Sequence, residues 1–232
     1  MNPMVSVTKF TNRHAASSSA ADTLAAGLQE AMAAGGRGSL VLSGGTTPGD
    51  CYSLLAEKRL DWARVSLVPS DERWVPPSEP ASNERLIRHR MTHGAAGAAR
   101  ILPMYREGLE PDAAPAAITA DLEALGDRFS GVLLGMGTDG HFASLFPDFE
   151  GLKEALDPTG ATRCVVVRTA ASPFPRISLT LPAMMRSPWI ALLFFGDAKL
   201  AVFEAALDGD SRYPVSALLQ QTSTPVRVLW AP

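Results

Sequence analysis

Short apolar runs alternate along this chain with longer segments in which apolar residues recur every three or four positions. Short runs bounded by Gly, Pro or polar clusters are typical of buried strands, and the longer spacing is typical of helices. The pattern predicts strands at residues 5–10, 39–42, 65–68, 101–104, 132–134, 163–168, 177–181, 189–195 and 226–230. It predicts helices at residues 15–34, 48–57, 83–91, 113–125, 197–207 and 215–219.

Strands that alternate with helices indicate the α/β class. We expect an open, mostly parallel, Rossmann-like sheet with helices on both faces. The 232 residues could form one large domain or two small ones. Because the sequence has no internal repeat and no clear linker, we predict a single domain over residues 1–232.

Composition narrows the classes of partner. The chain is 46% hydrophobic and 19% charged, as expected for a globular protein with a substantial core. Its formal net charge of -3 argues against nucleic acid or a membrane surface as partner. An anionic ligand would therefore need a local cluster of cations and backbone amides.

Several features predict a cytoplasmic protein. Cys51 and Cys164 lack the spacing of metal or redox motifs, so we expect both thiols to stay reduced. No apolar stretch follows the N-terminal Met, which argues against a signal peptide. The apolar run at residues 189–195 is too short to cross a bilayer.

Chemistry-bearing residues gather in loops that follow predicted strands. Open α/β sheets bind ligands at the carboxyl ends of their strands, so these loops should meet at one edge. They carry Ser43, Gly44, Gly45, Thr46 and Thr47, then Asp71, Glu72 and Arg73, then Gly137, Asp139 and His141.

The first loop, SGGTTP, has the character of a phosphate cradle. Small residues permit close approach, and free amides at a helix N-terminus attract anions. Pro48 fits the first helical position, with Thr47 as the N-cap. The alternative is a plain tight turn into a capped helix. No Lys follows where a Walker motif requires one.

The second loop, SDERW, combines two acids with a guanidinium. Arg73 could hold phosphate through its planar fork, and Asp71 could bind substrate hydroxyls or move a proton. Glu72 and Arg73 could equally form a solvated ion pair. Asn83 could contact a ligand or cap the helix that follows it.

The third loop places a carboxylate beside an imidazole. His titrates near neutral pH and Asp can orient it, so Asp139 and His141 could form an acid–base pair. Alternatively, Asp139 caps a helix and His141 lies on the surface. Two isolated cations, Arg176 and Lys199, could be anion ligands or surface charges.

The motifs SGGTTP, SDERWVP, SN, GMGTDGHFASLFP and PRISLT occur in an order that closely resembles the 6-phosphogluconolactonases of the glucosamine-6-phosphate isomerase/6-phosphogluconolactonase superfamily. The resemblance covers nearly the whole chain. It implies hydrolysis of 6-phospho-D-glucono-1,5-lactone to 6-phospho-D-gluconate in the oxidative pentose phosphate pathway, without a metal or an organic cofactor. The expected partner is a small sugar phosphate, and the expected oligomeric state is a monomer or a weak homodimer.

The resemblance also implies roles for the residues named above. His141 would be the base, and Asp139 would orient it or hold the substrate. The phosphate would lie near the amides of residues 43–47, with Arg73, Arg176 and Lys199 as cations. The other expected substrate contacts are Asp71, Asn83 and Gly137.

Two alternatives remain at this point. Glucosamine-6-phosphate deaminases resemble this chain, but they carry GHxAFNEP, with Glu where Phe146 stands, and usually DEY at residues 71–73. We expect Phe146 to pack a helical turn after His141 onto the core. A sugar-phosphate sensor on the same fold is the other alternative, although such regulators commonly carry an additional DNA-binding domain.

Overall fold

The computed structural model describes residues 2–126, 128–170 and 172–232. Its described strands are β1 (Val5–Lys9), β2 (Gly38–Leu42), β3 (Val65–Pro69), β4 (Asp71–Arg73), β5 (Arg100–Ile101), β6 (Gly131–Leu134), β7 (Cys164–Val167), β8 (Arg176–Leu179), β9 (Ile190–Phe195) and β10 (Val226–Ala231). Its described α-helices are α1 (Arg13–Ala33), α2 (Gly49–Ala56), α3 (Asn83–Met91), α4 (Ala114–Ala124), α5 (Leu152–Ala155), α6 (Leu181–Met184), α7 (Asp197–Leu207) and α8 (Val215–Gln220).

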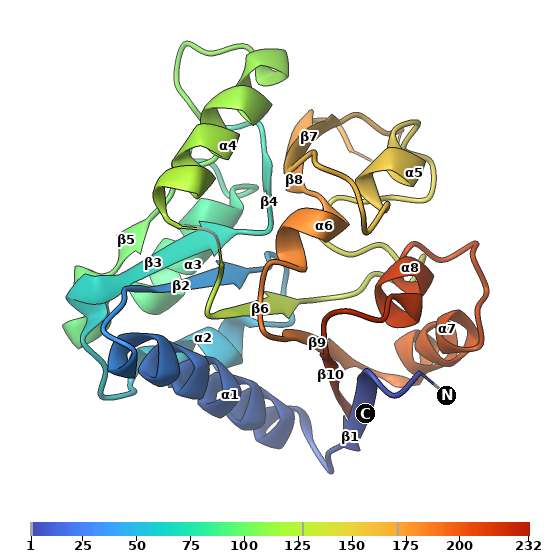
Figure 1. Cartoon of the computed structure of the whole chain (residues 1–232), viewed down its shortest axis with the longest axis horizontal. Helices are drawn as coiled ribbons and strands as arrows, with labels where there is room; N and C mark the ends of the chain where they lie inside the picture. The colour runs from blue at the N-terminus through green and yellow to red at the C-terminus, as the bar shows by residue number, and fades with distance from the viewer. Residues whose placement is uncertain (1, 127, 171) are drawn as a thin grey trace.

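Seven strands form the main sheet in the order β1-β10-β9-β6-β2-β3-β5 (Figure 1). Every strand pair in this sheet is parallel. The first and last strands are neighbours, with Val5 opposite Val226, so the two ends of the chain lie close together.

Alternation along each central strand divides the core into two clusters. In β2, Leu40 and Leu42 pack in one cluster with α1, and Val41 packs in the other. In β6, Leu133 joins the first cluster, and its neighbour Val132 joins the second. This is the two-sided burial of a parallel sheet. The predicted α/β class, with helices on both faces, is confirmed: α1 lies below the sheet in Figure 1, and α4 and α6 lie above it.

A second, antiparallel sheet in the order β4-β8-β7 was not predicted. Residues 71–73 were expected to be a loop, but they form β4 and pair with β8. A strand of sequence DER has no apolar run and no alternation that a sequence pattern can detect. Its pairing depends on β8, which lies a hundred residues later in the chain.

Two predicted helix starts were wrong by one residue. Pro48, not Thr47, occupies the N-cap position of α2, and no side chain caps that helix. Ser82, not Asn83, caps α3, because its Oγ accepts a hydrogen bond from the amide of Arg85 at 3.1 Å. Thr47 and Asn83 therefore do not cap these helices, and their polar side chains are available for other contacts.

The sheet changes its direction of winding between β2 and β6. After β2 the chain proceeds outward through β3 to β5, and β6 then pairs with β2 on its other side. The loops after β2 and β6 therefore diverge, which opens a crevice at the carboxyl ends of the strands.

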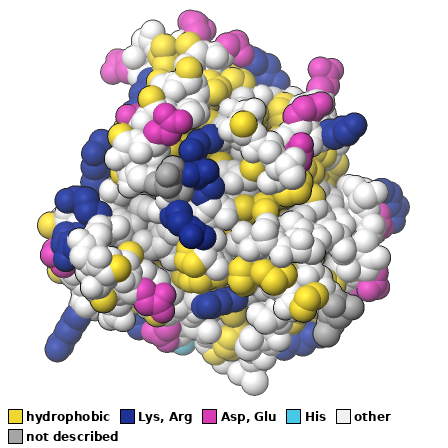
Figure 2. Space-filling model, in the orientation of Figure 1, with side chains coloured by type: hydrophobic (Ala, Val, Ile, Leu, Met, Phe, Trp, Pro, Cys, Tyr) yellow, Lys and Arg dark blue, Asp and Glu magenta, His cyan; other side chains and the backbone are white. Residues whose placement is uncertain are grey.

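Both signs of charge are present on the face shown in Figure 2, where a short row of Lys and Arg side chains crosses the middle. Within the described ranges, no helix is long and apolar enough to cross a membrane. The expectations of a single domain, a cytoplasmic location and no nucleic-acid partner stay predictions.

Candidate functional site

A cavity of about 220 Å³ lies at the crevice between the loops that follow β2 and β6. Its lining includes His141 and every predicted substrate-binding residue: Ser43, Gly44, Gly45, Thr46, Thr47, Asp71, Arg73, Asn83, Gly137, Arg176 and Lys199. Asp139 is not part of the lining but contacts His141 from behind. Parallel strands bring their carboxyl ends together, so residues distant in sequence meet here.

The loop after β2 is held at its base and open at its tip. The Tyr52 hydroxyl donates a 2.6 Å hydrogen bond to the carbonyl of Ser43. Gly45 has a φ of 85°, which side chains rarely tolerate. At Gly44, a Cβ atom would overlap the side-chain amide of Asn83. The glycines thus permit both the turn and the close approach of α3.

Two residues of the cavity lining each have a buried polar atom without a hydrogen-bond partner among the described residues. These atoms are Ser43 Oγ and Arg73 Nε. An unsatisfied buried donor costs about 1–3 kcal/mol, so such groups in a native protein call for an explanation. Both residues belong to the cavity lining, so these two polar groups lie next to the space that a ligand would occupy.

Arg73 and Arg176 face each other across the β4–β8 ladder, where they are a register pair. The Arg73 Nη1 donates to the carbonyl of Ala81 at 2.5 Å. Burial lowers the pKa of Arg176, and the nearby positive charge of Arg73 lowers it further, while Asp71 and Glu72 act in the opposite direction. Two guanidinium groups in repulsion make this wall of the cavity attractive to an anion.

Asp71 lies between the arginines and is almost fully buried. Its Oδ2 is 3.8 Å from Nη1 of Arg176 and accepts a 2.5 Å hydrogen bond from Ser144 Oγ. Its Oδ1 accepts from Ser70 Oγ at 3.1 Å and from Asn83 Nδ2 at 3.2 Å. Asn83 therefore orients Asp71 and does not cap the helix.

Glu72 is completely buried, and its carboxylate is bound on both oxygens. It accepts hydrogen bonds from the amides of Arg73 and Asn83 at 2.8 and 2.7 Å, from the amide of Glu84 at 2.7 Å and from Ser82 Oγ at 2.9 Å. Burial raises the pKa of Glu72, and these four hydrogen bonds oppose the rise. The alternative of a solvated Glu72–Arg73 pair is therefore wrong.

On another wall, the His141 Nδ1 and the Asp139 Oδ1 lie 2.5 Å apart, and the same oxygen accepts from the His141 amide at 3.2 Å. A Cβ at Gly137 would overlap both side chains, so this pair requires glycine there. The next helix begins at Leu152, so the alternative in which Asp139 caps a helix is wrong. With its proton on Nδ1, the neutral ring has a lone pair on Nε2 for use as a base.

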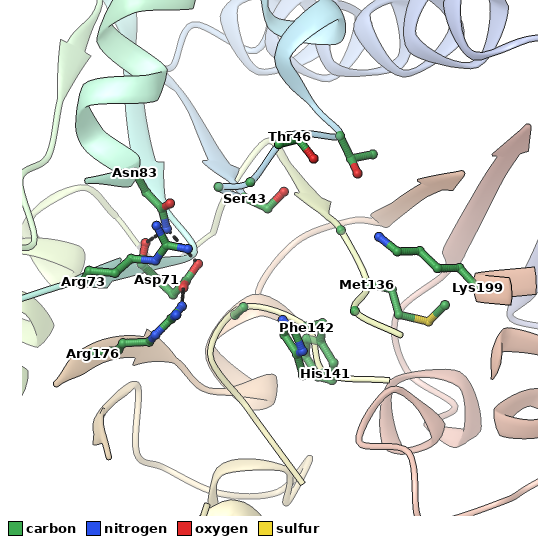
Figure 3. Close-up of a pocket in the computed structure, with 16 residues that line it drawn as sticks. Ser43, Thr46, Asp71, Arg73, Asn83, Met136, His141, Phe142, Arg176 and Lys199 are labelled. Carbon is green, nitrogen blue, oxygen red and sulfur yellow. Dashed lines mark hydrogen bonds and ion pairs between the residues drawn. The ribbon is translucent and has the colours of Figure 1, made fainter. Parts of the chain in front are cut away.

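Lys199 comes from the first turn of α7 and lies across the cavity from the two arginines (Figure 3). Burial lowers the pKa of its ammonium group, and the negative charge of Asp139 acts in the opposite direction. The cavity thus has cations on two sides, with His141 between them in the view of Figure 3.

Sequence reasoning missed part of the site. The cavity lining also includes Gly135, Met136, Phe142 and Ala143. Ala143 has a φ of 49°, an uncommon conformation for a residue with a side chain and one that often occurs at functional sites. The residue type alanine gives no sequence signal for a positive φ, so this conformation could not be predicted.

The sequence and the fold are similar to those of known proteins. Residues 11–230 match the family described as glucosamine-6-phosphate isomerases/6-phosphogluconolactonase. A protein named 6-phosphogluconolactonase from Rhizobium meliloti is 36% identical over 225 residues, which cover 96% of this chain and 97% of that protein. The crystal structure of a 6-phosphogluconolactonase from Shewanella baltica superimposes with a TM-score of 0.90 at 35% identity, covering all of both chains.

A monomeric glucosamine-6-phosphate deaminase has the same fold, with a TM-score of 0.78 at 20% identity over 97% of this chain and 96% of that one. The fold and the cavity define an α/β protein with an anion-attracting pocket at the switch point of a parallel sheet. More particularly, the chain belongs to the family of glucosamine-6-phosphate isomerases and 6-phosphogluconolactonases. The resemblance seen in the sequence motifs is confirmed.

Proposed function

We propose that this protein is a 6-phosphogluconolactonase, which hydrolyses 6-phospho-D-glucono-1,5-lactone to 6-phospho-D-gluconate in the oxidative pentose phosphate pathway. The observation that carries the proposal is the His141 ring, fixed by Asp139 through one nitrogen, in the wall of a cavity with cations on two sides. This cavity can hold a phosphorylated substrate next to a base.

The phosphate binds at the loop of residues 43–47. The backbone amides of residues 44–47 and the unpaired Ser43 hydroxyl are suitable donors, whereas the Ser43 amide already donates to the carbonyl of Leu133. Arg73, Arg176 and Lys199 supply the positive charge that a phosphate dianion needs, since charge-assisted bonds are roughly twice as strong as neutral ones. Asp71 and Asn83, which line the same cavity, bind the sugar hydroxyls.

Hydrolysis then needs one base and one water molecule. The His141 Nε2 takes a proton from water while the water oxygen attacks the lactone carbonyl carbon, which gives a tetrahedral oxyanion. The oxyanion collapses and breaks the bond to the ring oxygen, which receives the proton from the imidazolium. The acid formed releases its remaining proton to solvent. Asp139 holds the ring orientation and stabilises the imidazolium.

The named relatives support the lactone over an amino sugar, whereas the shared fold does not distinguish them. Phe146 supports the same choice. The deaminase reaction opens a sugar ring and moves a proton between carbons, which requires several acid and base groups. Phe146 can neither donate nor accept a proton.

Two assays on the purified protein test the proposal. Lactone hydrolysis is followed by acid release, with the spontaneous rate subtracted, and glucosamine 6-phosphate is assayed for ammonia and fructose 6-phosphate. We expect rapid acid release and no ammonia. Ammonia formation without accelerated hydrolysis would assign the deaminase activity. Tight binding of sugar phosphate without either reaction would assign the sensor.

A further inference from the structure

The Phe146 side chain contacts two functional residues at once. Its ring centroid is 4.3 Å from that of His141, with an interplanar angle of 36°. The guanidinium carbon of Arg176 lies 5.1 Å from the centroid of the same ring. The Phe146 ring thus contacts both the proposed base, His141, and one cation of the cavity, Arg176.

Phe146 is buried, and it contacts functional residues. Its exposed fraction is 6%, yet it belongs to neither of the hydrophobic clusters that the described residues form. Its neighbour Leu145 belongs to the larger cluster. The expected helical turn after His141 is absent, because residues 142–145 form turns and an isolated bridge. The burial expected of Phe146 is confirmed, but the helical turn that it was expected to pack is not formed.

The same segment reaches Arg176 a second time. Ser144 Oγ lies 3.4 Å from Nη1 of Arg176, while Oγ of Ser172 accepts from Nε at 3.0 Å. The backbone turns back at Ala143, which has positive φ, so that Ser144 and Phe146 both point toward Arg176. His141, at the start of the segment, is fixed relative to Arg176 by these contacts.

We propose that Phe146 is a positioning residue that sets the His141 imidazole and the Arg176 guanidinium at a fixed separation, so that the scissile carbonyl meets the base when the anionic group is bound. This inference deepens the proposed function and rests on it. The ring contacts the imidazole at a tilted angle, which leaves Nδ1 for Asp139 and Nε2 for the cavity. Its other contact holds the guanidinium through cation–π attraction.

The chemistry of an aromatic ring suits this position. A carboxylate at this position would form ion pairs with Arg176 and with protonated His141. It would then compete with an anionic ligand for these positive charges. An aliphatic side chain would fill the volume but would lack the quadrupole that attracts the cation. Phe146 thus contacts both groups without adding a negative charge or a titratable group next to them.

The test compares Phe146→Leu with Phe129→Leu. Phe129 has a similar exposed fraction, 9%, and lies at the opposite end of β6 from the cavity. Phe146→Leu should raise KM for the phosphorylated lactone by roughly 2- to 30-fold through the lost cation–π contact. It should also lower kcat by roughly 10-fold or more through misplacement of the base. Phe146→Tyr, which keeps the ring, should restore most of both, and Phe129→Leu should change only the melting temperature.

Two further measurements do not depend on turnover. The ring C–H resonances of His141, assigned by comparison with His141→Asn, should move in Phe146→Leu and stay in place in Phe129→Leu. The affinity for 6-phosphogluconate should fall only in Phe146→Leu. If that variant does not fold, Phe146→Met replaces it, since Met keeps the volume without the ring.

Kinetics and His141 resonances in Phe146→Leu that match those of Phe129→Leu would overturn the inference. Failure of the wild-type protein to accelerate lactone hydrolysis would instead overturn the proposed function. The resonances and the ligand affinity would still decide the position of the two side chains.

Discussion

The two sides of the cavity are built in different ways. On the arginine side, Asp71 and Arg176 have side chains that are only 5% and 14% exposed. Buried hydrogen bonds connect Asp71 to Asn83 of α3 and to Ser144 in the turn after β6. On the histidine side, His141 and Asp139 are 29% and 46% exposed, and they depend on their mutual contacts, on the Phe146 ring and on glycine at position 137.

The difference separates two tasks. Buried, cross-linked groups are preorganised, so that they bind a charged ligand without being rearranged. A base that must exchange a proton with water needs access to the solvent-filled cavity. We therefore expect the arginine side to govern ligand affinity and fold stability, and the histidine side to govern the chemical step.

Replacement of His141 by Ala or Asn should have the largest effect. Loss of a general base commonly costs ~10²–10⁴ in rate, so kcat should fall by that factor above the spontaneous background. The melting temperature should change little, because the ring is part of a half-open loop. Wild-type kcat in either variant would remove His141 from the mechanism.

Replacement of Glu72 by Gln tests the rigid side without touching the cavity. Gln can satisfy only part of the four donors that bind the carboxylate, and an unsatisfied buried donor costs about 1–3 kcal/mol. We expect a loss of that size in the free energy of unfolding, measured in urea. Glu79→Gln, at an exposed position nearby, is the control and should stay within about 0.5 kcal/mol of wild type.

Replacement of Arg73 or Arg176 by Ala should raise KM for the phosphorylated lactone. A hydrogen bond to a charged group contributes about 1.5–3 kcal/mol, which corresponds to roughly 10- to 100-fold. Unphosphorylated gluconolactone provides the comparison, because its hydrolysis should change far less. Equal losses on both substrates would mean that the arginines act on the reaction centre.

Replacement of Lys199 by Met should have the smallest effect, a several-fold weaker affinity for 6-phosphogluconate, because this ammonium group is only half-buried. The pH dependence identifies its contribution. The pKa of Lys199 is lowered, so the positive charge is lost at a lower pH than for an ordinary lysine. Affinity should therefore fall as pH rises in the range below 10.5, and Lys199→Arg should stay flat there. A matching fall in Lys199→Arg would assign the titration to another group.

The sequence was sufficient to predict which loops meet. Parallel strands end at one edge, so the residues after β2, β3 and β6 had to converge there, and the cavity lining confirms this. The two cations outside these loops, Arg176 and Lys199, were left open by the pattern alone. The structure brings both into the cavity wall.

The connections between these residues could not be predicted. Ser144 binds Asp71 across 73 positions of sequence, and no local pattern reports such a contact. Glu72 is a carboxylate at a fully buried position, which hydrophobicity assigns to the surface. Its burial is possible only because the first turn of α3 supplies donors, and that is a property of tertiary structure.

The pairing of β1 with β10 affects how the protein can fold during its synthesis. Because β10 lies between β1 and β9, β1 can join the main sheet only after β10 has been synthesised. Until residues 226–231 are synthesised, β9 has an unpaired edge, and α1 lacks its packing contacts with β10. Contacts between the ends of a chain slow folding, and unpaired strand edges favour aggregation. Deletion of residues 226–231 should therefore be far more damaging to folding than their distance from the cavity would indicate.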